Sequence, residues 1–412
     1  MRIGLYIEHG EGNGVGGAEL MMAMLASAWS RDHDVDLVHH RPPLTRERLA
    51  HFSADDYSRV TVRCVARDPQ PSAPWDPVRR YKAARRWQAA ISEPYDVFVN
   101  CTHWVPCFSH AGRGILLVLF PFYEPEWRPP ALDAELPRWK QLRHRLYYGL
   151  EWQRRLASYD QLAAISRYTA AWTEQRWGVS CEIVHPPVDV DFVRRPKEPL
   201  IVSVGRFSTM AHTKKQLEMV RMFAEMAGSG FGGWQYACVG GLNTRAENRE
   251  YFERVREAGQ CASVTVEANA PRPRVRSLLE RGRIFWHAAG LGEDLDRQPQ
   301  LAEHFGIATV EAMAAGCVPV VIDRGGQSEI VSHGENGFLW NTLDELAAYT
   351  RRLAADEGLW QRLSDAARRR ARDFERRRFI DRMSALAGLG AGARALDGGT
   401  PGVAAAQGTP AS

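Results

Sequence analysis

The sequence predicts an α/β protein built from two successive, doubly wound domains that face a central cleft. Short apolar runs typical of buried strands alternate with longer amphipathic stretches along both halves of the chain. A break separates the halves, because Pro186-Pro187 interrupts the pattern and residues 194–199 are polar and proline-bearing. The chain has 412 residues, which is enough for two or three domains that each bury a core.

The first series of elements occupies residues 1–195. A strand at 2–7, a glycine-rich loop at 8–17, a helix at 18–29 and a strand at 34–38 form a βαβ unit, which indicates a parallel sheet. Further strands are expected at 59–65, 97–100, 114–119, 161–165 and 182–185, and helices at 78–91, 137–158 and 167–177.

The second series occupies residues 196–370. Strands are expected at 200–204, 235–239, 263–266, 284–287, 318–322 and 338–340, and helices at 214–227, 243–258, 273–281, 343–356, 359–373 and 375–387. A short helix is expected after Gly325-Gly326, and Asn243 is a suitable N-cap for its helix. Residues 388–412 are mostly Ala, Gly, Pro and Thr, so we expect a disordered tail.

Composition excludes several classes of protein. The formal net charge of +4 is too small to indicate nucleic-acid binding, and seven scattered cysteines without a C-x-x-C pair favour a reducing compartment over a disulfide framework or a zinc site. The N-terminal apolar run is too short for a signal peptide. No apolar run approaches the roughly 18 residues of a membrane-spanning helix. We therefore expect a cytoplasmic protein without a structural metal.

Two glutamates, Glu303 and Glu311, mark the candidate site. Glu303 precedes the Phe305-Gly306-Ile307 step, and Glu311 lies about two turns along the helix that follows. The unpaired first amides of such a helix can hold a phosphate, and each carboxylate can accept hydrogen bonds from sugar hydroxyls. The stretch predicts a nucleotide-sugar site. A general acid/base pair for hydrolysis is an alternative, and Glu311 alone could be an ordinary exposed residue.

Basic residues upstream of the glutamates support the same interpretation. Gly205-Arg206 follow the first strand of the second series, and Lys214 and Lys215 open the next helix, where cations oppose the helix dipole. Arg206 and the lysines could together neutralise a diphosphate leaving group. A solvated surface cluster is the alternative.

Two further features are less specific. The glycine loop could bring the backbone at Gly16 and Gly17 close to a phosphate or a sugar, or it could merely allow tight packing. No Gly-Lys-Ser/Thr follows, which excludes a P-loop.

His287 ends a strand, where it either packs or contacts a ligand. Neither an H-E-x-x-H motif nor a G-x-S-x-G elbow is present, which weighs against a zinc enzyme and an α/β-hydrolase.

Two basic, aromatic stretches at residues 79–87 and 138–148 are predicted to be helical. Such helices can rest on an anionic membrane surface or meet an anionic acceptor. Solvated helix faces are the simpler explanation.

The chain resembles the family-4 glycosyltransferases of the GT-B fold, whose two domains are Rossmann-like. The resemblance rests on Val204-Gly-Arg206-Phe, Lys214-Lys-Gln, Trp286-His-Ala-Ala-Gly290, the stretch from Glu303 to Gly316, and Gly325-Gly-Gln-Ser-Glu-Ile-Val. Gly-Gly-Ala-Glu19 and Pro187-Val-Asp189 also fit. The His-Phe-Gly-Ile variant resembles the branch of eukaryotic lipid-linked mannosyltransferases and their bacterial relatives.

The resemblance implies a retaining, metal-independent transfer of a mannose- or glucose-type hexose from a UDP- or GDP-sugar. Arg206 and Lys214, or Lys215 if the alignment slips by one residue, would bind the diphosphate. Glu303 would contact the donor sugar, the amides of residues 305–307 a phosphate, and Glu311 the ribose. The first domain would bind the acceptor, which is a lipid-linked glycan, a polysaccharide or a small natural product. Helix 371–387 would cross back to the first domain.

One position departs from the family pattern. Leu119 stands where many relatives carry a histidine that reaches the donor sugar, two residues before Pro121. His103 and His110 lie nearby in sequence, but neither fits the pattern. A competing hypothesis is therefore a non-catalytic, nucleotide-binding partner protein. Another is a different GT-B activity, such as a nucleotide-sugar epimerase.

Overall fold

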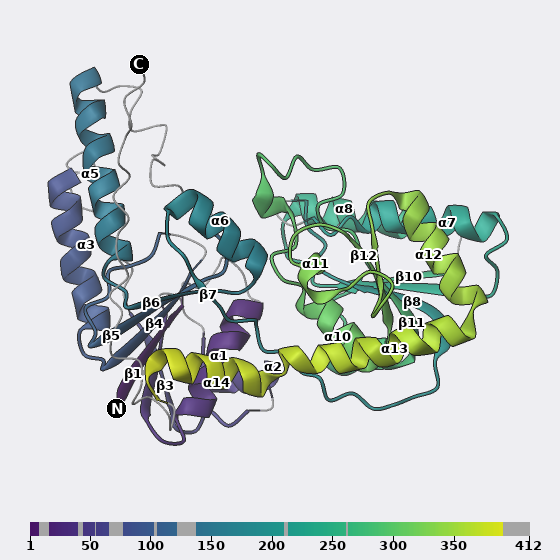
Figure 1. The fold of residues 1–412 in the computed structure, drawn as a ribbon, viewed down its shortest axis with the longest axis horizontal. Coiled ribbons are helices and arrows are strands. Elements are labelled where there is room, and N and C mark those ends of the chain that lie inside the picture. Colours follow the sequence, from purple (N-terminus) through teal and green to yellow (C-terminus); the bar gives the residue numbers. More distant parts are fainter. Residues whose placement is uncertain are drawn as a thin grey trace, which may run out of the picture.

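The computed structural model describes residues 1–7, 16–39, 44–53, 55–65, 77–102, 105–121, 137–209, 213–260 and 263–389. Within them the chain forms two parallel-sheet α/β domains that lie side by side (Figure 1). The predicted fold class is therefore confirmed. The first loop at 8–15 and the tail from residue 390 lie outside the described residues.

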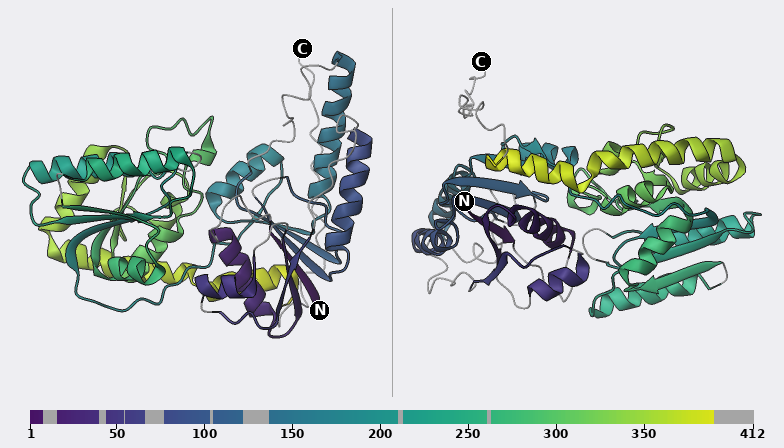
Figure 2. Two further views of the ribbon diagram at one scale, coloured as in Figure 1. Left: turned by 180° about the vertical axis from the view of Figure 1, so that it is seen from behind. Right: turned by 90° about the horizontal axis from the view of Figure 1, so that it is seen from below.

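The first domain contains a parallel sheet with the strand order β3-β2-β1-β4-β5-β6-β7. Its strands are β1 (Arg2–Ile7), β2 (Asp34–His39), β3 (Val60–Cys64), β4 (Val97–Thr102), β5 (Arg113–Val118), β6 (Gln161–Ala164) and β7 (Glu182–Ile183). Its helices are α1 (Gly17–Trp29), α2 (Arg46–Phe52), α3 (Pro77–Ser92), α5 (Arg138–Leu156) and α6 (Arg167–Trp177). The long helices α3 and α5 lie side by side and rise away from the sheet at one end of the molecule (Figures 1 and 2).

The second domain contains a parallel sheet with the order β10-β9-β8-β11-β12-β13. Its strands are β8 (Glu198–Val204), β9 (Gln235–Gly240), β10 (Val264–Ala268), β11 (Gly282–His287), β12 (Val318–Ile322) and β13 (Phe338–Trp340). Its helices are α7 (Gln216–Gly228), α8 (Ala246–Ala258), α9 (Arg272–Arg281), η1 (Pro299–Leu301), α10 (Ile307–Ala315), α11 (Gln327–Ile330), α12 (Leu343–Ala355) and α13 (Glu357–Ala371). Strand β12, between β11 and β13, is buried along its whole length, as expected for a parallel sheet covered on both faces.

The chain crosses between the domains twice, and the two crossings touch. Val188, in the segment that leads from β7 to β8, pairs with Glu375, which follows the short helix η2 (Arg372–Phe374). Helix α14 (Arg376–Ala387) then packs against the first domain, where Trp29 donates a hydrogen bond to Ser384 over 2.8 Å. Figure 1 shows this last helix beneath the first sheet.

Several predicted boundaries need correction. The helix expected at 214 begins at Gln216, because Lys215 has φ 55° and cannot continue a right-handed helix. Asn243 does not cap α8, whose N-cap is Arg245. The Asn243 side chain instead accepts a hydrogen bond from the Arg245 amide. The strand expected at 182–185 ends at Ile183, and helix α2 was not predicted.

Two features are absent from the described residues. No helix there is both long enough and apolar enough to cross a membrane. The same part of the chain contains no group of three or more His, Cys, Asp or Glu side chains placed to hold a metal ion.

Candidate active site

The predicted site residues lie at the carboxyl ends of two neighbouring strands. Gly205 and Arg206 follow β8, and His287 is the last residue of β11, which pairs with β8. Glu303 lies in the loop between β11 and α10, as predicted. This edge is where parallel α/β sheets bind their ligands.

Glu303 is the centre of the site. One of its oxygens, Oε2, forms an ion pair with the Lys214 ammonium and lies 2.8 Å from Nε2 of His287. The Glu303 and Lys214 side chains are 19% and 16% exposed, so a ligand can still reach both groups. The His287 ring is buried, and its contact with the site is this hydrogen bond to Glu303.

The charges of this cluster follow from its surroundings. Burial alone raises the pKa of Glu303, but the Lys214 charge and the His287 hydrogen bond outweigh it and hold the pKa well below its ordinary value. Burial lowers the pKa of His287, despite the opposing effect of Glu303. At neutral pH Glu303 is therefore an anion beside a neutral imidazole, whose Nε2–H donates to the carboxylate. Its buried Nδ1 has no partner among the described residues.

Gly205 leaves room for the Lys214 side chain. A Cβ at Gly205 would lie 2.6 Å from Cγ of Lys214, so a larger residue would displace this lysine from Glu303. Lys215 turns the other way and pairs with Glu293, in the loop after β11. The structure therefore separates the two lysines, and Lys214 is the one that joins the cluster.

Arg206 is exposed, and its guanidinium forms no hydrogen bond or ion pair with another described residue. Its backbone is fixed, because the Gln216 side chain donates to the Arg206 carbonyl oxygen over 3.1 Å. A cation held in place at the backbone but not neutralised is suited to bind an anionic ligand.

The amino end of α10 is built around a glycine turn. Gly306 has φ 123°, and a Cβ there would lie 2.5 Å from Nε2 of Gln327. Gly326 donates its amide to the Glu303 carbonyl over 2.7 Å, so the glycine pair before α11 packs directly on this loop. The Phe305 side chain is buried, so this residue can offer a ligand only its backbone. Thr309 and Val310 donate their amides to the Gly306 carbonyl, which leaves the Ile307 and Ala308 amides at the start of α10 without an acceptor in the helix.

Glu311 lies on α10 as predicted, but its carboxylate is buried and bound by both terminal nitrogens of Arg272 at the start of α9. The alternative interpretation of Glu311 as an ordinary exposed residue is therefore wrong. Arg272 was not predicted; it stands in an Arg-Pro-Arg-Val-Arg run whose other arginines bind elsewhere.

The first domain meets the site at the amino end of α10 and at the loop that contains His304. A Cβ at Gly17, the first residue of α1, would lie 3.3 Å from Cδ1 of Ile307, so the amino ends of α1 and α10 are in contact range. Gly16 precedes α1, and its amide donates to the Glu19 carboxylate over 3.0 Å. Phe120 stacks on His304 with ring centroids 4.1 Å apart. Leu119, at the family's histidine position, is buried in the core instead.

The comparisons with known proteins agree with this architecture. A family model for Glycosyltransferase Family 4 matches residues 15–192, and one for Glycosyl transferases group 1 matches residues 189–370. A glycosyltransferase of Rickettsia africae has the same fold, with 12% identity and a TM-score of 0.64 over 94% of this chain and 97% of that one. Anabaena Alr3699/HepE in complex with UDP is also similar, with 16% identity and a TM-score of 0.62 over 93% and 98%.

Fold and site together define a two-domain glycosyltransferase of the GT-B class. The chain belongs to glycosyltransferase family 4. Among curated relatives, it is similar to the GDP-Man:Man(3)GlcNAc(2)-PP-Dol alpha-1,2-mannosyltransferase of Dictyostelium discoideum, with 28% identity over 200 residues. That match covers 45% of this chain and only 37% of the relative.

Proposed function

We propose that the protein is a retaining glycosyltransferase that moves a mannose- or glucose-type hexose from a UDP- or GDP-sugar to an acceptor hydroxyl, without a bound metal. The observation that carries the proposal is the convergence of Lys214 and His287 on Glu303, beside an unneutralised Arg206. The membership of the chain in glycosyltransferase family 4 supports it.

Stabilisation of the leaving group is the main source of catalysis in this proposal. Transfer breaks the bond between the sugar C1 and the diphosphate and forms one between C1 and the acceptor oxygen. The hydroxyl proton passes to the departing diphosphate, on whose oxygens negative charge accumulates. Arg206 and Lys214 neutralise that charge, and the first amides of α10 hold a phosphate. Lys214 exchanges Glu303 for the diphosphate when the donor binds, because both compete for one ammonium group.

Glu303 then positions the sugar. Its lowered pKa keeps it ionised, so it accepts hydrogen bonds from sugar hydroxyls. A hydrolase with an acid/base pair needs one carboxyl group whose pKa is raised, and Glu303 is the opposite case. Glu311, oriented by Arg272, accepts the ribose hydroxyls with the lone pairs that the guanidinium leaves open.

A donor panel tests the assignment. UDP-, GDP- and dTDP-sugars are offered to the protein, and release of nucleotide is followed for Arg206→Ala, Lys214→Ala and the exposed control Arg254→Ala on α8. Loss of one charge-assisted contact to the diphosphate should lower kcat/KM by about tenfold or more in the first two variants only. Full transfer by both Arg206→Ala and Lys214→Ala would refute the site.

The same panel separates the competing hypotheses. A protein that binds UDP or GDP but releases no nucleotide from any donor with any acceptor is the non-catalytic partner suggested by Leu119. An epimerase converts the donor sugar without a glycosylated acceptor, whereas a transferase forms product and free nucleotide in equal amounts.

We also propose that the acceptor is presented at an anionic membrane surface, at the inner face of a membrane, where α3 and α5 touch the lipid. Helix α5 exposes Trp139, Leu142, Leu146 and Leu150, which are spaced to share one face. Helix α3 contains five basic residues and no acidic one. The side chains of Lys140, Arg143 and Arg145 lie outside the described part of the chain. Co-sedimentation with anionic liposomes tests this contact.

A further inference from the structure

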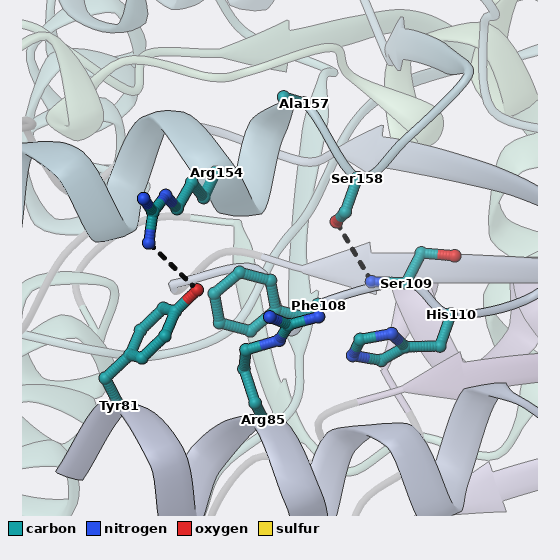
Figure 3. A pocket seen from close by; sticks show the side chains of 8 residues that line it. All are labelled: Tyr81, Arg85, Phe108, Ser109, His110, Arg154, Ala157 and Ser158. Atoms are coloured by element: carbon teal, nitrogen blue, oxygen red, sulfur yellow. Dashed lines mark hydrogen bonds between the residues drawn. The ribbon is translucent and has the colours of Figure 1, made fainter. Parts of the chain in front are cut away.

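A cavity of about 470 Å³ lies between α3 and α5, and the proposed transfer reaction does not use it (Figure 3). Its lining residues come from both helices and from the segments that lead into β5 and β6: Tyr81, Arg85, Phe108, Ser109, His110, Arg154, Ala157 and Ser158. Because these segments precede their strands, the cavity lies at the amino-terminal edge of the first sheet. The candidate active site lies beyond the carboxyl ends of the second sheet.

Two arginines of the cavity have no carboxylate partner among the described residues. The Arg85 guanidinium lies 5.8 Å from the ring centroid of Phe108, and Arg154 donates a hydrogen bond to the Tyr81 hydroxyl over 3.3 Å. Figure 3 shows Arg85 on α3 and Arg154 on α5 with the two rings between them. Aromatic rings and a hydroxyl hold the guanidinium groups in place but leave their charge uncompensated.

The neighbouring Arg155 differs from Arg85 and Arg154 because a carboxylate neutralises its charge. Arg155 also lies over Phe108, at 4.6 Å, but two of its nitrogens bind the Glu151 carboxylate. A third nitrogen donates to the Pro106 carbonyl over 2.8 Å. Arg155 is therefore satisfied within the fold, whereas Arg85 and Arg154 keep donors for something else.

His110 is the third nitrogen-bearing side chain that lines the same cavity. Its Nε2 atom is buried and has no hydrogen-bond partner among the described residues. Figure 3 places the imidazole beside the Arg85 guanidinium. Burial lowers the pKa of His110, the Arg85 charge lowers it further, and Glu93 opposes both effects. A bound anion would relieve the repulsion between the two groups.

We propose that the cavity between α3 and α5 binds a phosphate group, with Arg85, Arg154 and His110 as its ligands and Tyr81 and Phe108 as its apolar wall. A phosphate has several acceptor oxygens and up to two negative charges, which match two guanidinium groups and an imidazole. The phosphate belongs either to a soluble phosphorylated molecule or to a lipid headgroup, and the chemistry of the contact is the same.

Inorganic phosphate is the first probe. Titration of the full chain at constant ionic strength, balanced with chloride, should show saturable binding and an increase in the pKa of His110, followed by NMR of its ring protons. Arg85→Gln combined with Arg154→Gln should weaken binding by about tenfold or more. Arg86→Gln, an exposed neighbour on α3 outside the cavity, is the matched control, and circular dichroism checks that α3 and α5 remain helical.

Vesicles distinguish the two sources of phosphate. Phosphatidylcholine vesicles with and without phosphatidic acid are compared for the same variants. If the double variant loses far more binding to phosphatidic acid than Arg86→Gln, which removes one surface charge of the basic helix α3, the ligand is a headgroup. If only the affinity for inorganic phosphate falls, the ligand is soluble. Either result supports the site. Absence of saturable phosphate binding, or equal loss in Arg86→Gln, would overturn it.

Discussion

At the scale of single residues, Glu303 has one partner that a ligand can displace, Lys214, and one that it cannot displace, His287. The Lys214 pair is only partly shielded from water, so its attraction is weaker than that of a fully buried pair and a diphosphate can displace it. The His287 bond is different, because that imidazole is buried and cannot follow another ligand. We infer that Lys214 serves the donor phosphates, while His287 is a positioning residue for Glu303.

Replacement of His287 should change the pH dependence of transfer. The ordinary pKa of Glu303 is 4.5, and its folded value lies well below that, partly because of the His287 hydrogen bond. In His287→Ala this value rises, so Glu303 becomes protonated at a higher pH and the acidic limb of kcat/KM moves to higher pH. A profile of kcat/KM for the donor from acidic to neutral pH measures the shift. A loss of equal size at every pH would contradict the positioning role.

The predicted residues of the site share a simple geometric cause. Gly205, Arg206 and His287 follow or end parallel strands, and such ends meet at one edge of a sheet whatever the details of packing. Arg272 could not be found this way. It stands 39 residues from Glu311 in sequence, and nothing in the sequence distinguishes it from Arg274, which binds Glu267. Only the packing of α9 beside α10 selects it.

At the scale of elements, helix α10 depends on the turn that precedes it. Gly306 combines a positive φ with a close approach to Gln327, whose Oε1 accepts a hydrogen bond from Thr309 over 2.9 Å. This turn sets both the direction of the first amides of α10 and the position of Glu303. The sequence predicted the helix, but it could not predict that the loop before α11 would be the surface on which the turn is built.

Gly306→Ala therefore tests the turn before α10 without changing any charge of the site. Both the left-handed backbone and the contact with Gln327 are unfavourable for alanine, so we expect a loss of about 1–3 kcal/mol in stability and a higher KM for the donor. Gly334→Ala is the control, because Gly334 has φ 78° but open space around its Cα. Thermal unfolding and donor kinetics are compared for the two variants. Similar effects on donor KM in both would count against a special role for the turn.

Helix α7 shows where sequence patterns fail at element ends. A run of helix-forming residues from Lys214 predicts an early start, yet the chain keeps Lys214 outside the helix so that its side chain reaches Glu303. The left-handed Lys215 makes that possible. A functional contact between residues far apart in the sequence thus overrides local propensity, which is a common reason for a misplaced boundary.

At the scale of the whole molecule, the two domains are joined through their crossings and through direct contacts. Glu329 of α11 binds His185 of the connecting segment and accepts a hydrogen bond from the Arg167 amide over 2.7 Å. Arg376 of α14 pairs with Asp55 in the first domain. Helix α14 therefore belongs structurally to the first domain, although it follows the second in sequence. Local patterns predict that helix but not the face on which it packs.

The proposed membrane contact also depends on the arrangement of the whole molecule. Helices α3 and α5 lie at the end of the molecule away from the second domain (Figure 1). Leu142→Ser combined with Leu146→Ser removes apolar side chains that are 68% and 63% exposed, so the fold should be unaffected. Burial of a leucine contributes about 1.5–3 kcal/mol, so binding to anionic liposomes should weaken by about tenfold or more.

Val193→Ser is the control for that measurement, because Val193 is also exposed but lies in the segment between the domains. Co-sedimentation at low and high salt separates the two contributions. High salt should weaken the electrostatic contribution of the basic residues of α3. The apolar contribution of the α5 leucines should remain at high salt and be lost in the leucine variants. Wild-type protein that fails to bind at low salt, or leucine variants that bind like wild type, would remove the membrane from the proposed function and leave a soluble acceptor.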